Sequence, residues 1–133
     1  MLSLRKVPLS GDKLVDWIFK QFIVFLRRET LSIKRKKRLI DSDDPHCKVL
    51  RGLMDPTVGP SQYHIEITLN SAKKHHCNRD EEVETLIHEL CHILFWKTRE
   101  RFIYQMECLL TNRLMVEQKN YLKIFIPRDE VKK

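Results

Sequence analysis

The pentapeptide His88-Glu89-Leu90-Cys91-His92 holds the residues of this chain that are best suited to chemistry. Residues four apart lie on the same face of an α-helix, so the two histidines can bind one metal ion together. Glu89 lies about 100° further round the helix, where its carboxylate can deprotonate a water on the metal rather than bind the metal itself. The pattern predicts a zinc site with His88 and His92 as ligands and Glu89 as general base.

The residues around this motif predict an amphipathic helix that begins near Asn78 to Asp80 and ends at about Lys97. Asn78 and Asp80 are good N-cap residues, and glutamates follow in the first turn, where they favour the positive end of a helix. The helical period gathers apolar residues on one face: Val83, Leu86, Ile87, Leu90, Ile93 and Leu94, with Cys91 at the border. Both histidines lie on the opposite side, as a metal site requires. The alternative is a surface helix with solvated histidines.

A catalytic zinc ion normally takes three protein ligands and leaves one position for water. A second helix is predicted over Glu100 to Gln118, and an antiparallel hairpin with its turn at residues 98–101 would place Glu107 opposite His92. Glu107 lies at the edge of the apolar face, where a carboxylate needs a partner. We therefore predict Glu107 as the third ligand, with a solvated glutamate as the alternative, and judge Glu100 too near the turn.

The remaining elements predict the α+β class. Capping residues and helical spacing indicate an N-terminal helix over about Lys13 to Arg28. A short strand is expected at Lys48–Met54, a half-buried one at Tyr63–Asn70, where apolar residues alternate, and another short one at Leu122–Ile126. The basic run Lys34–Arg38 fits either a strand or a continuation of the first helix.

Length and composition favour one globular domain over residues 1–133, since apolar residues make up 42% of the chain. No secretory or transmembrane segment is predicted, so we expect a cytoplasmic protein with reduced cysteines. The net charge of +7 permits binding to nucleic acid, a membrane surface or acidic substrates. A solvated face is the favoured interpretation of Lys34–Arg38, and the short apolar segment Leu14–Leu26 is more typical of a core helix than of a membrane helix.

From Tyr63 to Gln118 the sequence resembles the gluzincins, metallopeptidases in which a glutamate on a later helix completes an HExxH zinc site. YHIEITLN is similar to their cleft-edge strand, EEVETLIHELCHILF to their active-site helix, and YQMECLLTNRLM to their ligand-bearing helix. Small single-domain relatives include the minigluzincins and the ImmA/IrrE-type regulatory peptidases. The resemblance implies a zincin-like fold with a small mixed sheet, Glu107 as a zinc ligand, and hydrolysis of peptide or protein substrates.

The implied mechanism gives Glu89 a proton from a zinc-activated water, which it passes to the leaving amine. Tyr104, one turn before Glu107, is a candidate for stabilising the oxyanion, or else a half-exposed aromatic residue. The alternatives are a latent zincin-fold regulatory or binding protein and a basic nucleic-acid-binding domain. Latency would follow if the strand Leu122–Ile126 paired along the cleft and brought Asp129 or Glu130 toward the metal.

Cysteine and histidine residues outside the motif suggest two further interpretations. A second, structural zinc site could form from His46, Cys47, His75, His76 and Cys77, although their spacing fits no standard zinc knuckle. Cys91 is expected to pack in the core, and Cys108 to be exposed.

Overall fold

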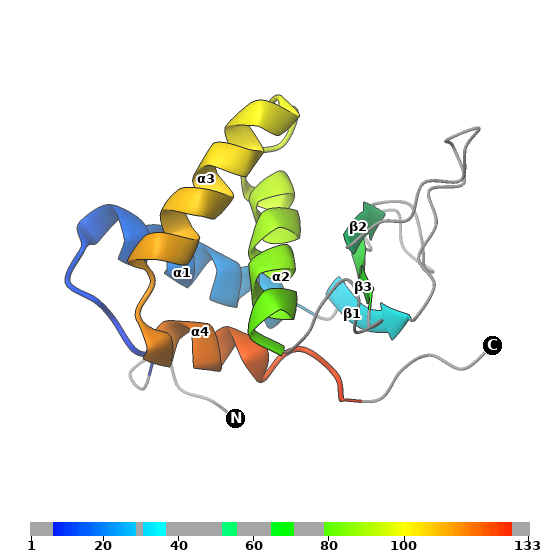
Figure 1. Cartoon of the computed structure of the whole chain (residues 1–133), viewed down its shortest axis with the longest axis horizontal. Coiled ribbons are helices and arrows are strands. Elements are labelled where there is room, and N and C mark those ends of the chain that lie inside the picture. Colours follow the sequence, from blue (N-terminus) through cyan, green and yellow to red (C-terminus); the bar gives the residue numbers. More distant parts are fainter. Residues whose placement is uncertain (1–6, 29–30, 37–51, 56–64, 71–78, 129–133) are drawn as a thin grey trace.

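The computed structural model describes residues 7–28, 31–36, 52–55, 65–70 and 79–128, which form helices and a small sheet (Figure 1). The elements follow one another as α1 (Lys13–Leu26), β1 (Leu31–Lys36), β2 (Gly52–Asp55), β3 (Ile65–Asn70), α2 (Arg79–Leu94), α3 (Glu100–Arg113) and α4 (Val116–Lys123). Helix α2 stands between the sheet on one side and α3 on the other, and it also contacts α1 and α4. The predicted α+β class is confirmed, and the helix with the histidines is the central element of the fold.

Helix α1 begins as its sequence predicts. The Asp12 side chain accepts hydrogen bonds from the backbone nitrogens of Leu14 and Val15, at 3.1 and 3.2 Å, which satisfies two donors that the first turn leaves free. The helix ends at Leu26, two residues earlier than expected, with Arg27 as its C-cap. One face is buried in the core: Val15, Ile18, Phe19, Phe22, Ile23 and Leu26. None of the described helices is long and apolar enough to cross a membrane.

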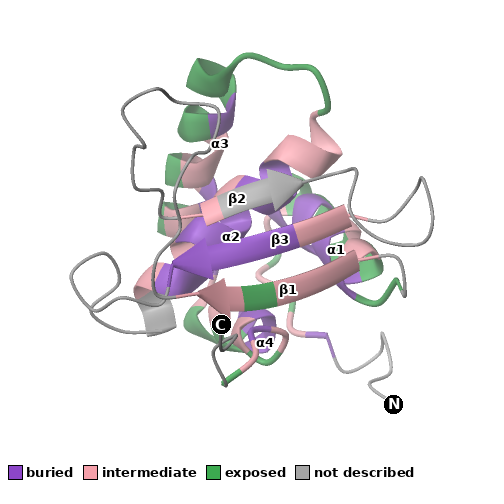
Figure 2. Cartoon of the chain, turned by 90° about the vertical axis from the view of Figure 1, so that its right-hand side faces the viewer, coloured by how far each residue is buried: buried purple, intermediate pink, exposed green. Residues whose placement is uncertain are grey.

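The sheet is mixed, with β3 between a parallel β1 and an antiparallel β2 (Figure 2). The expectation that the strand at Tyr63–Asn70 is a cleft-edge strand is therefore wrong, because its described part, β3, has hydrogen-bonded neighbours on both sides. Its second half, from Ile67 to Asn70, is buried on both faces, as a central strand with covered faces must be, so the half-buried prediction also fails there. Strand β2 is instead the outer strand that contacts α2.

Several predicted segments are only partly described. Residues 34–36 of the basic run lie in β1, which decides for the strand interpretation, while residues 37 and 38 lie outside the described part of the chain. Of the strand expected at 48–54, residues 52–54 are in β2, and residues 48–51 are outside the description.

The predicted hairpin between α2 and α3 is present, but both helices end earlier than predicted, and the connection, residues 95–99, lies earlier in the chain than the expected turn at 98–101. Helix α2 ends at Leu94, and Lys97 has a φ of 66°, the left-handed conformation that commonly ends helices. The Thr98 hydroxyl donates to the Phe95 carbonyl oxygen at 2.6 Å and holds the turn. At the other end, α3 stops at Arg113 because Leu114 is extended, so the helix predicted to reach residue 118 is two helices, α3 and α4.

The strand predicted at Leu122–Ile126 is wrong, because this segment ends α4 and continues as a turn. A strand would bury Leu122, Ile124 and Ile126 together, since they alternate. Instead Leu122 and Ile126, one helical turn apart, are buried, and Ile124 is 65% exposed. The latency device built on this strand is lost with it, and Asp129 and Glu130 lie outside the described residues.

Asp16 joins three segments of the fold. Its carboxylate accepts hydrogen bonds from the backbone nitrogens of Ser10 and Gly11 and from the Ser10 hydroxyl, each at 2.8 Å. It also accepts one at 3.0 Å from the side chain of Gln118, which lies in α4. The N-terminal segment, α1 and α4 are therefore held together by one buried carboxylate.

Candidate metal site

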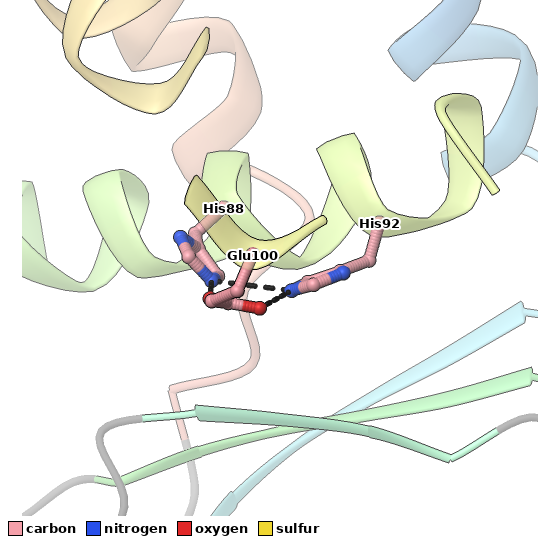
Figure 3. Close-up of side chains that lie close together, drawn as sticks. All are labelled: His88, His92 and Glu100. Carbon is pink, nitrogen blue, oxygen red and sulfur yellow. Dashed lines mark hydrogen bonds and ion pairs between the residues drawn. The ribbon is translucent and has the colours of Figure 1, made fainter. Parts of the chain in front are cut away.

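His88 and His92 lie one turn apart on the side of α2 that faces away from the helix's buried apolar face, as predicted (Figure 3). Their Nε2 atoms are 3.2 Å apart, and the ring planes make an angle of 70°. Both side chains are part-buried, at 16% and 25% exposure. The two nitrogens that can bind a metal therefore converge on one point at the edge of the core.

Glu100, at the start of α3, completes this group (Figure 3). Its carboxylate oxygens lie 2.6 Å from Nε2 of His88 and 3.0 Å from Nε2 of His92. The expectation that Glu100 is too near the turn is wrong, because an extended glutamate side chain spans roughly the length of a helical turn, about 5.4 Å. Counting residues from the turn compares only backbone positions, so it does not account for the length of the glutamate side chain. A glutamate in the first turn of the second helix was the available signal.

Glu107 also contacts His88, on the other side of its ring. Its Oε1 lies 2.7 Å from Nδ1 of His88, the ring nitrogen that points away from His92. Ligand atoms within 4.8 Å of one another come from His88, His92 and Glu100, and Glu107 is not in this group. The geometry thus places Glu100, and not Glu107, in the group that could hold a metal ion, and it leaves Glu107 in contact with the other ring nitrogen of His88.

Electrostatics separate the two histidines. Burial disfavours a charged His88 ring, but the hydrogen bond with Glu107 and the negative charges of Glu89 and Glu100 outweigh it and raise the pKa of His88. Both ring nitrogens of His88 face carboxylates, which only accept hydrogen bonds, so the charged ring fits this environment. Burial lowers the pKa of His92, and the charge of His88 adds to this against the opposing effect of Glu100. His92 therefore holds its proton less firmly.

Glu89, next to His88 on α2, is buried. It is 6% exposed, and burial raises its pKa to about 7, with Glu100 and Glu107 adding to the rise and His88 opposing it. Strand β2 covers it: a Cβ at Gly52 would lie 3.6 Å from Oε1 of Glu89 and only 2.5 Å from Cγ2 of Thr85. A carboxyl group with a pKa near neutrality can both accept and return a proton.

Gly52 is a residue that the sequence interpretation missed. Only a residue without a side chain lets the β2 backbone come this close to α2. A glycine inside a predicted strand often marks such an approach, so the signal was present.

Three other predicted positions can be compared with the structure. Tyr104 is 59% exposed, as expected for a half-exposed aromatic residue on α3, and no described contact joins it to the histidines. Cys91 is buried, and burial raises the pKa of its thiol to about 12, which confirms the expectation that it packs in the core. Cys108 is exposed, also as predicted.

The basic run offers less free charge than its sequence suggests. Lys34 pairs with Glu66 at 2.9 Å. Arg35 donates to one oxygen of the buried Glu82 through Nε and Nη2, at 3.0 and 2.8 Å. These pairings leave fewer cations for phosphate groups and weaken the nucleic-acid interpretation.

The second zinc site, predicted from residues 46, 47 and 75–77, lies outside the described part of the chain.

No family model matches the sequence, and neither curated proteins nor solved structures include a match to it.

Proposed function

We propose that this protein is a zincin-like, zinc-dependent metallopeptidase, with His88, His92 and Glu100 as zinc ligands and Glu89 as general base. The observation that carries the proposal is the convergence of two Nε2 atoms and one carboxylate from two different helices. The resemblance to gluzincins supports the same reaction from the sequence.

The donor set fits a zinc ion. Two nitrogens bound at about 2.05 Å with a tetrahedral angle are about 3.3 Å apart, and the Nε2 atoms here are separated by 3.2 Å. Two imidazoles and one carboxylate are ligands that zinc accepts in catalytic sites, where a fourth position is left for water or substrate. Zinc held there would supply Lewis acidity, which lowers the pKa of a water molecule and polarises a peptide carbonyl.

The protein's own groups support hydrolysis in three ways. Glu89, next to His88 in sequence and buried under β2, would accept the proton of the attacking water and deliver it to the leaving amine. Glu107 would hold the His88 ring in place through Nδ1, which directs Nε2 toward the metal. Within the described sheet, β2 has one hydrogen-bonded neighbour, so an extended peptide could pair with its other edge beside Glu89.

The test begins with metal content. The purified protein should contain close to one zinc per chain, and substitution of either histidine by alanine should remove it. Glu89→Gln should keep the zinc and slow cleavage of a labelled unfolded protein by about 100-fold or more. Wild-type protein that takes up no zinc would refute the whole proposal. A zinc-loaded protein that cleaves no substrate would support the metal site but refute the peptidase activity.

Two glutamate variants separate the ligand from the orienting residue. Glu107→Gln should weaken zinc binding by about 10- to 100-fold, the usual effect of losing an orienting partner, and Glu100→Gln should weaken it further. Glu117→Gln, at an exposed position of α4, is the matched control and should leave affinity unchanged. The reverse order, with Glu107→Gln the more damaging change, would restore Glu107 as the third ligand.

A latent, non-enzymatic zincin fold is the second candidate, and the exposure of Tyr104 favours it. A peptidase needs a donor for the developing oxyanion, and the side chain predicted for this role is 59% exposed. Zinc content together with an inactive wild type would support this second function. Activity that Tyr104→Phe leaves unchanged would show that the donor lies elsewhere.

A further inference from the structure

Helix α1 exposes a row of apolar side chains that no described part of the chain covers. Leu14, Trp17 and Val24 are 52%, 51% and 42% exposed. At 100° per residue they lie within an arc of about 80° on one side of the helix. The opposite side packs in the core, so α1 carries apolar side chains on its exposed side as well as on its buried side.

The same side of α1 carries positive charge and no negative charge. Lys13 and Lys20 are exposed and lie beside the apolar row, and the exposed Arg28 follows just after the helix. The only acidic residue within α1 is Asp16, which is buried and hydrogen-bonded to the N-terminal segment. Whatever covers this face must therefore accept apolar side chains and carry negative charge.

A second copy of the chain fits this face poorly. In a symmetric dimer through α1, the same face of both copies would meet, which would gather Lys13 and Lys20 of both copies at one contact, and like charges close together are unfavourable. The cores of protein interfaces are also depleted in charged residues, whereas here two lysines flank the apolar side chains. An anionic membrane surface accepts this mixture, since headgroups take the cations while tryptophan and leucine enter the interfacial region.

We propose that the face formed by Leu14, Trp17, Val24, Lys13 and Lys20 docks on an anionic lipid surface, with α1 lying in the plane of the membrane. The helix has 14 residues, about 21 Å in length, which is too short to span the roughly 30 Å hydrocarbon core. The proposal concerns a surface separate from the histidines and does not depend on the metal site.

The test measures binding of the full chain to vesicles in a buffer with EDTA. Vesicles of phosphatidylcholine with about one-third phosphatidylserine should bind the protein, vesicles of phosphatidylcholine alone should bind it far less, and salt should weaken binding. The double variant Lys13→Gln, Lys20→Gln should bind anionic vesicles about 25-fold more weakly, because each cation near the surface contributes about fivefold to the partition coefficient. Trp17→Ser should reduce it by about tenfold.

Trp96 provides a matched control, because it is 49% exposed and lies in the turn between α2 and α3. Trp96→Ser should leave vesicle binding unchanged. In Trp96→Phe, Trp17 is the one remaining tryptophan, and lipids brominated near the headgroup should quench its fluorescence. Circular dichroism and thermal unfolding verify that each variant is folded, and because Leu14 is exposed, Leu14→Ser gives a second variant if Trp17→Ser is unstable.

Three results would overturn the proposal. The first is equal binding to anionic and neutral vesicles, or none to either. The second is anionic binding that Trp17→Ser and Leu14→Ser leave intact. The third is evidence that something else covers the face. A dimer in sedimentation velocity that Trp17→Ser dissociates would assign the face to a second copy of the chain. Binding to polyglutamate that depends on Trp17, without binding to vesicles, would assign it to an acidic protein.

Discussion

Gly52→Ala should destabilise the protein through a single contact. The new methyl group would lie 2.5 Å from Cγ2 of Thr85, about 1 Å closer than two carbon atoms tolerate. Overpacking of this kind costs about 1–3 kcal/mol, and the reduced freedom of the unfolded chain offsets about 0.5–1 kcal/mol of it. We therefore expect the free energy of unfolding to fall by about 1.5 kcal/mol, measured by urea denaturation followed by circular dichroism.

Thr85→Ser is the partner substitution, because it removes Cγ2 and keeps the hydroxyl that donates to the Glu81 carbonyl at 3.4 Å. Alone it should cost about 1 kcal/mol for a lost buried methyl group. In the double variant, the alanine methyl group fills the space that the threonine methyl group leaves. Its free energy of unfolding should therefore lie within about 0.5 kcal/mol of the wild-type value. If the two single effects simply add in the double variant, β2 does not approach α2 at Gly52 as described.

Three further predictions concern regions outside the histidine cluster. Asp16→Asn should cost about 2 kcal/mol at neutral pH, because the amide cannot accept all four hydrogen bonds. Burial opposes the charge of Asp16, but these hydrogen bonds hold its pKa below the usual value, so its stabilisation is present above about pH 4 and lost as pH falls through the lower folded value. Urea denaturation from pH 7 to 2 should accordingly show a smaller loss for Asp16→Asn than for wild type, and equal losses would contradict this. Arg35→Met should cost about 3 kcal/mol by leaving Glu82 buried without its cation, while Arg35→Met with Glu82→Leu should recover much of this; thermal and urea denaturation check both, and a harmless single variant would exclude a buried pair. Alkylation of the folded protein followed by peptide mapping should modify Cys108 and spare Cys91, and equal modification would contradict their difference in burial.

Much of the helical structure could be predicted, because its signals are local. Asp12 caps α1, and the apolar period of α2 identifies its buried face. The break between α3 and α4 could not be predicted in this way, since no glycine or proline marks it. It depends on a distant contact: the Gln118 side chain accepts from the Met115 backbone nitrogen and donates to Asp16, which favours an end to α3 and a new start for α4.

The candidate site divides in the same way. His88, Glu89 and His92 are related by helical spacing alone, so their relative placement follows from the sequence once the helix is predicted. The third carboxylate depends on how α3 is positioned against α2, which is determined by side-chain packing between the helices and by the turn. Counting from a turn at residues 98–101 selects Glu107, but α2 ends at Leu94, so the turn lies earlier and different residues face each other across the hairpin.

The two glutamates act on one ring from opposite sides. Glu100 and Glu107 are seven residues apart, about 10.5 Å along α3 and nearly on the same face of that helix. Their carboxylates nevertheless meet His88 at Nε2 and at Nδ1, at 2.6 and 2.7 Å. Since one rigid helix carries both carboxylates, a shift of α3 along α2 would lengthen one contact as it shortens the other. The register between the two helices therefore positions the proposed third ligand and orients the first histidine at the same time.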